Sequence, residues 1–356
     1  MPRRRNIPSK QASRVILAGD IGGTKTHIGC FTAERGTLSL TAERSFPSGS
    51  FPGLEAIIER FLAGHPDRVT SACFGVAGPV ERGRCQATNI PWVVDAQSLQ
   101  RALGCDAVWL INDLEAMAYG ILTLPTSAFA TLNTGQAQPH GTMAVIAAGT
   151  GLGEAALVWD GQHYHAVASE GGHTDFAPRN ELEIELLRYL LKRFGRVSYE
   201  RILSGPGKVS VYQFLKDTGH GEEPAWLTKR FAQGDPSPII SEMALNGRSG
   251  LCAKALELFV SIYGAEAGNL ALKCLSRGGV YVGGGIAPTV LPLLQDGTFM
   301  QAFSDKGRMS SLLSRMPVRV ILEPRAPLFG AAHYATMLFK PNQHGPKSAI
   351  KKTASA

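Results

Sequence analysis

Near its N-terminus the sequence reads Val15-Ile16-Leu17-Ala18-Gly19-Asp20-Ile21-Gly22-Gly23-Thr24-Lys25-Thr26 and continues His27-Ile28-Gly29-Cys30-Phe31. An apolar run, a glycine turn and a second apolar run predict a β-hairpin whose tip brings backbone close to a ligand. The adjacent glycines and the threonine can point backbone N–H groups and a hydroxyl at one anionic oxygen, as phosphate sites require. Taken alone, the stretch fits an ordinary tight hairpin equally well.

Asp20 stands before these glycines, where its carboxylate would repel a phosphate group on its own. A divalent cation between the two removes the conflict, because Mg²⁺ binds through few carboxylates, water and phosphate oxygens. The stretch is not a Walker motif, since residues 19–25 lack the required spacing and no helix follows. The candidate phosphate-binding residues are therefore Gly19, Asp20, Ile21, Gly22, Gly23 and Thr24, with Asp20 linked to Mg²⁺, and a tight hairpin without a ligand stays equally open.

The same arrangement returns later in the chain, where an apolar run at 143–148 precedes Gly149-Thr150-Gly151-Leu152-Gly153 and a further apolar run at 155–159. Two such hairpins indicate two related lobes that face one another and clamp a triphosphate between their tips. The second tip would contribute Gly149, Thr150, Gly151 and Gly153. A third cluster, Gly283-Gly284-Gly285, would let a flat aromatic base approach the backbone at Gly284, although packing glycines explain it as well.

Asn112 and Asp113 follow an apolar strand at 108–111, at the end where α/β proteins place their ligands. Asp113 could accept a hydroxyl proton there, while the alternative interpretation is that Asn112 or Asp113 caps the next helix. Two further polar groups are Glu170-Gly171-Gly172-His173 and Glu200. Carboxylates, an amide and an imidazole suit hydrogen bonds to adjacent sugar hydroxyls.

The rest of the chain shows alternating α/β order. Helices are predicted at 52–62, 182–194, 251–275 and 327–338, and strands at 69–76, 108–111 and 279–282. Asn180 and Glu183 form a capping box before the second of these helices.

Length and composition limit the classes of protein to which the chain can belong. A chain of 356 residues exceeds the usual size of one domain, and its 44% hydrophobic and 18% charged residues are ordinary for a globular protein. No apolar run reaches the roughly 18 residues of a membrane helix, and no signal peptide follows Met1. The six cysteines form no C-x-x-C pair, which indicates reduced thiols in a cytoplasmic protein.

The net charge of +7 is concentrated at the two ends of the chain. Nine positive charges at 1–14 and 340–356, subtracted from +7, leave −2 for residues 15–339. We therefore expect flexible basic tails at 1–14 and 341–356, solvated rather than bound to nucleic acid.

Together these motifs resemble the bacterial-type ATP-dependent glucokinases of the sugar kinase and actin-like ATPase superfamily. The resemblance covers residues 15–334 and rests on six ordered motifs, at 19–24, 88–92, 111–113, 149–153, 170–178 and 200–205. Carried over by position, it places the catalytic base on Asp113 and the ATP-binding stretches on the two glycine tips. Its sugar ligands fall on Asn112, Glu170, His173 and Glu200. Lys25 departs from the family, since some relatives carry asparagine there.

The resemblance implies an α/β fold of the two-lobed, actin-like ATPase (ribonuclease H-like) type with a deep interlobe cleft. The small lobe would comprise 15–111 plus 327–340, and the large lobe 112–326. The implied reaction is phosphorylation of the 6-hydroxyl of glucose by ATP with Mg²⁺, in a cytoplasmic homodimer with no nucleic-acid or membrane partner.

Two alternative functions remain to be considered. Kinases of the related repressor/kinase family usually carry a cysteine-rich zinc motif, whereas residues 174–251 here contain no cysteine. A sugar-sensing regulator without turnover would need a DNA-binding helix-turn-helix, for which residues 1–14 are too short and irregular.

Overall fold

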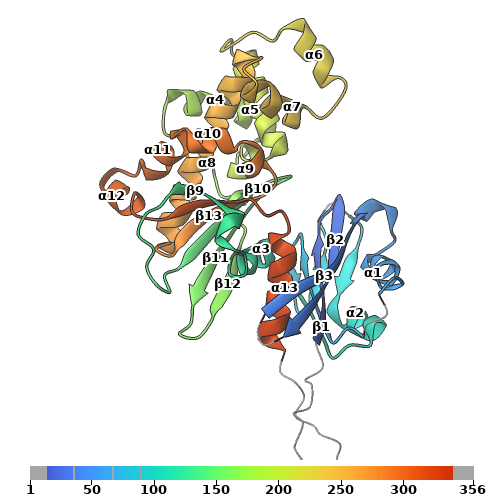
Figure 1. The fold of residues 1–356 in the computed structure, drawn as a ribbon. Helices are drawn as coiled ribbons and strands as arrows, with labels where there is room; N and C mark the ends of the chain where they lie inside the picture. The colour runs from blue at the N-terminus through green and yellow to red at the C-terminus, as the bar shows by residue number, and fades with distance from the viewer. Residues whose placement is uncertain (1–13, 35–36, 66–67, 89, 340–356) are drawn as a thin grey trace, which may run out of the picture.

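The computed structural model describes residues 14–34, 37–65, 68–88 and 90–339. Two large β-sheets form the frame, helices cover their outer faces, and two helices lie between them (Figure 1). This confirms the predicted α/β class. The predicted tails at 1–14 and 341–356 lie outside the described residues, apart from Arg14.

The first sheet has five strands in the order β3-β2-β1-β4-β8. β1 pairs antiparallel with β2 and parallel with β4, which pairs parallel with β8. The strands are β1 Arg14–Ile21, β2 Lys25–Glu34, β3 Thr37–Pro47, β4 Ser71–Val76 and β8 Ala107–Asn112. Two helices, α1 Leu54–Leu62 and α2 Ala96–Leu103, accompany this sheet, as does a small sheet of β5 Val80–Glu81, β6 Arg84–Gln86 and β7 Val93–Asp95.

The second sheet has six strands in the order β12-β11-β10-β13-β14-β9. Its first five strands repeat the pairing directions of the first sheet: antiparallel, antiparallel, parallel, parallel. The strands are β9 Phe129–Asn133, β10 Met143–Ala148, β11 Leu152–Trp159, β12 Tyr164–Ser169, β13 Gly279–Gly283 and β14 Val318–Ile321. The predicted duplication of a glycine-tipped hairpin is thus confirmed, because β1–β2 and β10–β11 occupy equivalent positions.

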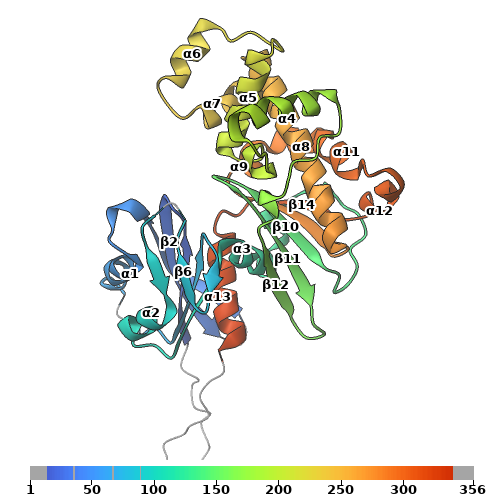
Figure 2. The same cartoon turned by 180° about the vertical axis from the view of Figure 1, so that it is seen from behind.

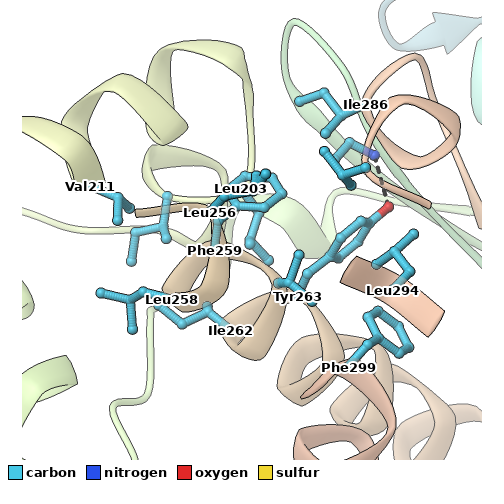
Figure 3. Packing of buried hydrophobic residues seen from close by; sticks show 14 of the residues in the cluster. Leu203, Val211, Leu256, Leu258, Phe259, Ile262, Tyr263, Ile286, Leu294 and Phe299 are labelled. Atoms are coloured by element: carbon cyan, nitrogen blue, oxygen red, sulfur yellow. Dashed lines mark hydrogen bonds between the residues drawn. The ribbon is translucent and has the colours of Figure 1, made fainter. Parts of the chain in front are cut away.

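Most helices gather over one face and one end of the second sheet (Figures 1 and 2). They are α4 Glu181–Phe194, α5 Gly205–Asp217, α6 Ala225–Phe231, α7 Pro236–Leu245, α8 Gly250–Cys274, α9 Ile286–Thr289, α10 Leu291–Gln295, α11 Thr298–Ser304 and α12 Ser310–Leu313. Figure 3 shows Tyr263 of α8 at the centre of their core, packed beside Phe299. Its hydroxyl accepts a hydrogen bond from Ala148 N (3.1 Å), which fixes the end of β10 just before the second tip.

Helices α3 Asp113–Ile121 and α13 Ala326–Leu338 lie between the two sheets and share a core with both. Their backbones touch at two glycines. A Cβ on Gly120 would collide with the carbonyl oxygen of Ala326, and a Cβ on Gly330 with that of Ala116. These small residues therefore let the two helices pack in direct backbone contact.

Helix and strand ends differ from prediction by one or two residues. The predicted helix at 52–62 begins at Leu54, because Gly53 is extended and serves as its N-cap. The predicted strand at 69–76 begins at Ser71, while the helices predicted at 251–275 and 327–338 each begin one residue earlier. None of the helices in the described ranges is long and apolar enough to span a membrane.

Candidate active site

The carboxyl ends of β1 and β8 bring Asp20 and Asp113 together. Parallel pairing sets Asp20 beside Gly75 of β4, and Val76 beside Asn112 of β8. Gly75 has no side chain, and a Cβ there would lie only 2.7 Å from the Ala116 Cβ and 3.6 Å from the Asp113 Cα. The glycine therefore lets the first turn of α3, which starts with Asp113, pack against the end of the sheet.

Both aspartates have pKa values above the usual range of this side chain. Burial and the Asp113 carboxylate raise the pKa of Asp20 to about 7, while Lys25 lowers it. Burial also raises the pKa of Asp113 to about 6, and Glu170 adds to this rise, whereas the Leu114 N–H opposes it. The pKa of Asp113 thus responds to Glu170, which directly follows β12 of the second sheet, as well as to the neighbouring Leu114.

Asn112 is the N-cap of α3, so the structural alternative considered for it is confirmed. Its Oδ1 accepts from Leu114 N (2.9 Å) and its Nδ2 donates to Gly78 O (3.2 Å). Asn112 N donates to Glu115 Oε2 (2.9 Å), which completes a capping box. The amide still has a second N–H, so the cap does not exclude a ligand.

The first glycine tip is braced from outside the motif by Ser48. Gly22 N donates to Lys25 O (3.0 Å) across the turn, and Ser48 Oγ donates to Gly22 O (2.7 Å). Ser48 N donates to Thr24 O (3.0 Å). Ile21 is fully buried, so only its backbone can face a phosphate.

The second tip is held by Glu200 and by α5. Glu200 Oε2 accepts from Leu152 N (3.1 Å), and a Cβ on Gly151 would lie 2.5 Å from that same oxygen. Gly205 N, at the start of α5, donates to Gly149 O (2.8 Å). Gly153 lies in β11, where a Cβ would collide with Leu114 of α3, so its role is to let the tip pack against that helix.

Gly284 lies at the same sheet edge, since its neighbour Gly283 pairs with Ala147 at the end of β10. Its φ of +81° and its close approach to the Ala148 carbonyl both require glycine.

Three of the four residues assigned to sugar binding, Glu170, His173 and Glu200, lie close together. The Nε2 of His173 lies 3.8 Å from Glu170 Oε2, and its Nδ1 lies 3.9 Å from Glu200 Oε1. Glu170 and His173 are exposed, whereas the side chain of Glu200 is 31% exposed. The structure thus places all three in one cluster that carries open hydrogen-bonding capacity.

Two residues of this site escaped sequence analysis. The Asn112-x-x-Glu115 spacing could have revealed Glu115, because it is the spacing of a capping box. Ser48 offered no signal, since it reaches the first tip only through the pairing of β2 with β3. Asp175, two residues after His173, forms an ion pair with Arg196 (2.7 Å).

The oxygen donors present suit Mg²⁺ carried by ATP. Within the described ranges, no three or more histidine, cysteine, aspartate or glutamate side chains are arranged to bind a metal ion. The available donors are the carboxylates of Asp20 and Asp113, and a cation between them would relieve their repulsion. Mg²⁺ is usually held by one or two carboxylates plus substrate phosphates, which matches this sparse set.

Comparisons with known proteins agree with one another. A sequence model of the glucokinase family matches residues 17–338. A curated glucokinase from Nostoc sp. is 44% identical over 340 residues, covering 91% of this chain and 99% of its own length. The crystal structure of glucokinase from an Antarctic psychrotroph has a TM-score of 0.80 at 31% identity and covers 91% of this chain and 99% of its own.

A more distant structure shares the fold alone. It is a ROK family glucokinase from Streptomyces griseus in complex with glucose and AMPPNP, with a TM-score of 0.61 at 22% identity, covering 91% of this chain and 99% of its own. Since both the family model and a 44% identical relative match over almost the whole length, the chain belongs to the glucokinase family.

Proposed function

We propose that this member of the glucokinase family transfers a phosphoryl group from ATP to the 6-hydroxyl of D-glucose, giving glucose 6-phosphate and ADP for glycolysis. The observation that carries this is the electrostatic coupling of Asp113 both to Asp20, at the first glycine tip, and to Glu170, in the sugar cluster. A hydroxyl held by Glu170 is therefore close to a base, and that base is close to a phosphate-binding turn.

Asp113 is the general base. Its carboxylate accepts the 6-hydroxyl proton as that oxygen attacks the γ-phosphorus, and the bond from phosphorus to the bridging oxygen of ADP breaks. A pKa near 6 leaves Asp113 ionised at neutral pH and yet more basic than an ordinary aspartate.

Glucose is held by Asn112, Glu170, His173 and Glu200. The carboxylates accept hydrogen bonds from sugar hydroxyls, while the Asn112 amide and the imidazole can donate. Glu200 has a double role, because the same carboxylate fixes Leu152 N in the second tip. The sugar and the phosphate groups are thus positioned by one side chain.

The two glycine tips and Gly284 bind ATP. Backbone N–H groups of Gly23, Thr150 and Gly151 hold phosphate oxygens, with Gly19, Asp20, Ile21, Gly22, Thr24, Gly149 and Gly153 shaping the two turns. When bound, Mg²⁺ neutralises charge on the transferred phosphoryl group, and Asp20 would hold it directly or through water. ATP as donor is supported by the AMPPNP complex of the Streptomyces griseus structure.

The fold is assigned to the actin-like ATPase (ribonuclease H-like) type, with a deep cleft between two lobes. The repeated strand order of the two sheets supports this. Residues 15–111 plus 327–340 form the small lobe and 112–326 the large lobe. The enzyme works as a cytoplasmic homodimer on glucose and ATP, without nucleic acid or membrane.

A matrix of sugars and phosphoryl donors tests the proposal. Purified protein is assayed with glucose, fructose, mannose and N-acetylmannosamine, each with ATP, ADP or polyphosphate. Glucose with ATP should give the highest kcat/KM, and the product should be glucose 6-phosphate. A higher kcat/KM for N-acetylmannosamine, or no sugar phosphate at all, would overturn it.

A further inference from the structure

Two buried glutamates lie beneath the glucose cluster and have no part in the mechanism above. Glu154 follows Gly153 in β11, Glu266 lies in α8, and they are 1% and 0% exposed. Their side chains form a hydrogen bond with each other. Two carboxyl groups can do this only if one keeps its proton, because an ionised carboxylate is an acceptor only.

The surroundings identify which glutamate keeps the proton. Glu266 Oε2 accepts from Asn269 Nδ2 (2.7 Å) and its Oε1 from Lys273 Nζ (3.3 Å), and both donors favour the ionised form. Glu154 Oε1 is buried without a hydrogen-bond partner, which costs less on a neutral acid than on a carboxylate. Burial and the charge of Glu266 raise the pKa of Glu154 well above its usual range.

The pair contacts both segments that carry the glucose cluster. On one side, Glu154 Oε2 packs against Gly171, at which a Cβ would collide with it. Gly171 begins the short helix η3 Gly171–His173, directly after Glu170. On the other side, Asn269 Nδ2 donates to both Glu266 Oε2 (2.7 Å) and the Tyr199 hydroxyl (3.0 Å). Tyr199 precedes Glu200 in the short helix η4 Tyr199–Arg201.

We propose that Glu154 and Glu266, joined by one shared proton, are positioning residues that set the spacing of η3 and η4 for glucose. Loss of the proton would place two negative charges beneath the cluster, and their repulsion would push Gly171 and Tyr199 apart. Glu170, His173 and Glu200 would move with them. The inference rests on the proposed sugar-binding role of these three residues.

Few other ionisable groups face the pair. Burial raises the pKa values of Tyr199, Tyr263 and Cys274, so these groups stay neutral well above pH 7. The cations that face the pair are Lys273 and Lys306, and Glu183 and Arg179 lie behind them. Burial lowers the pKa of Lys306, so a comparison that changes Glu154 alone is needed.

The variant Glu154→Gln provides that comparison. Glutamine keeps the shape of protonated glutamic acid and an N–H for Glu266, but it cannot ionise. KM for glucose and for ATP would be measured from about pH 6.5 to about pH 9.5. In the wild type, KM for glucose should rise above neutral pH by about tenfold, which corresponds to one unit of pKa coupling, with a smaller change in kcat. In Glu154→Gln, KM for glucose should stay flat at its neutral value.

Two further variants control for structural effects. Glu223→Gln alters another poorly exposed glutamate, bound to Tyr212 and Thr228 and remote from the cluster, and it should follow the wild-type pH curve. Glu154→Asp shortens the acid and should raise KM for glucose at every pH. A Glu154→Gln curve identical to wild type would overturn the pairing role.

The underlying site assignment is tested separately by Glu170→Gln. If Glu170→Gln leaves KM for glucose unchanged at pH 7, the glucose site itself is misplaced and the pair has no sugar segment to position. If Glu170→Gln weakens glucose but Glu154→Gln keeps the wild-type pH rise, only the pairing role is wrong.

Discussion

Asp113 combines a chemical task with an electrostatic cost, because the carboxylate that accepts the sugar proton also repels Asp20. We expect Asp113→Asn to lower kcat by about 10²–10⁴. Glucose affinity should persist, since the amide keeps the shape of the side chain. The melting temperature should rise at pH 8, because a poorly solvated negative charge is removed. Steady-state kinetics, calorimetric titration and thermal unfolding measure these three effects.

Asp95→Asn is a matched control for this substitution. Asp95, at the end of β7, caps α2 through Ser98 N (2.8 Å), and asparagine caps as well as aspartate. This variant should keep the kcat of the wild type. An Asp113→Asn enzyme that retained more than half of that kcat would contradict the base assignment.

The raised pKa of Asp113 should also appear in the pH profile. Below about pH 6 the carboxylate takes up a proton, so kcat/KM for glucose should fall by about tenfold per pH unit. Glu170 raises this pKa by its negative charge, so Glu170→Gln should move the acid limb to lower pH in addition to weakening glucose. An acid limb that stays in place, or moves to higher pH, would show that Glu170 does not act on the base.

At the scale of single elements, substitutions in the second glycine tip can distinguish effects on stability from effects on ligand binding. A Cβ on Gly149 would meet nothing within 4 Å, whereas one on Gly151 would lie 2.5 Å from Glu200 Oε2. Gly149→Ala should therefore leave the melting temperature within about 1 °C, since surface substitutions without contacts change stability by at most about 0.5 kcal/mol. If the phosphates of ATP approach this turn closely, Gly149→Ala should raise KM for ATP several-fold.

Gly151→Ala serves as the paired comparison for Gly149→Ala. By displacing Glu200 it should raise KM for glucose as well as KM for ATP. Wild-type KM for ATP in Gly149→Ala would mean that the nucleotide phosphates do not lie against this tip.

Elements with strong local signals could be predicted from sequence. The hairpins around Asp20 and Gly149 were predicted because apolar runs flank a glycine turn, and α8 because its apolar residues continue over many turns. Their ends moved by a residue or two, as at Gly53, where the backbone rather than the side-chain pattern sets the helix start.

Features built from distant residues could not be predicted in this way. Ser48 reaches the first tip across the β2–β3 pairing, and Glu154 meets Glu266 only when α8 packs on the second sheet. No sequence pattern near Ser48 or Glu154 indicates which distant residue each of them contacts. The residues of the sugar cluster were candidates because of their chemistry, but only the family resemblance assigned them to one site, since they are scattered along the chain from Asn112 to Glu200.

At the scale of the whole molecule, the chain crosses between the sheets at two places. One is the step from β8 into α3, and the other is the connection from β14 to α13, where Arg325 binds both Glu323 (2.7 Å) and Glu43 (3.1 Å). Asn112 belongs to the first sheet and Glu170 to the second, so a sugar that contacts both favours a closed arrangement through its differential affinity.

Glucose should therefore reduce the radius of gyration in small-angle scattering, and ATP hydrolysis without sugar should stay slow. Asp113→Asn with glucose and ATP provides a complex without turnover for the same measurement. An unchanged scattering profile at saturating glucose would mean that the two sheets already hold their final arrangement.

The packing of α13 also has a consequence for how the protein is made. This helix, at residues 326–338, covers β1 and β4, which are synthesised long before it. The first sheet therefore lacks its inner cover until residues 326–338 have been synthesised and have left the ribosome. Nascent chains stalled before residue 326 should be cleaved quickly by protease in that sheet, whereas chains with α13 outside the exit tunnel should resist. Helix α13 thus completes the first sheet only after all strands of the second sheet have been synthesised.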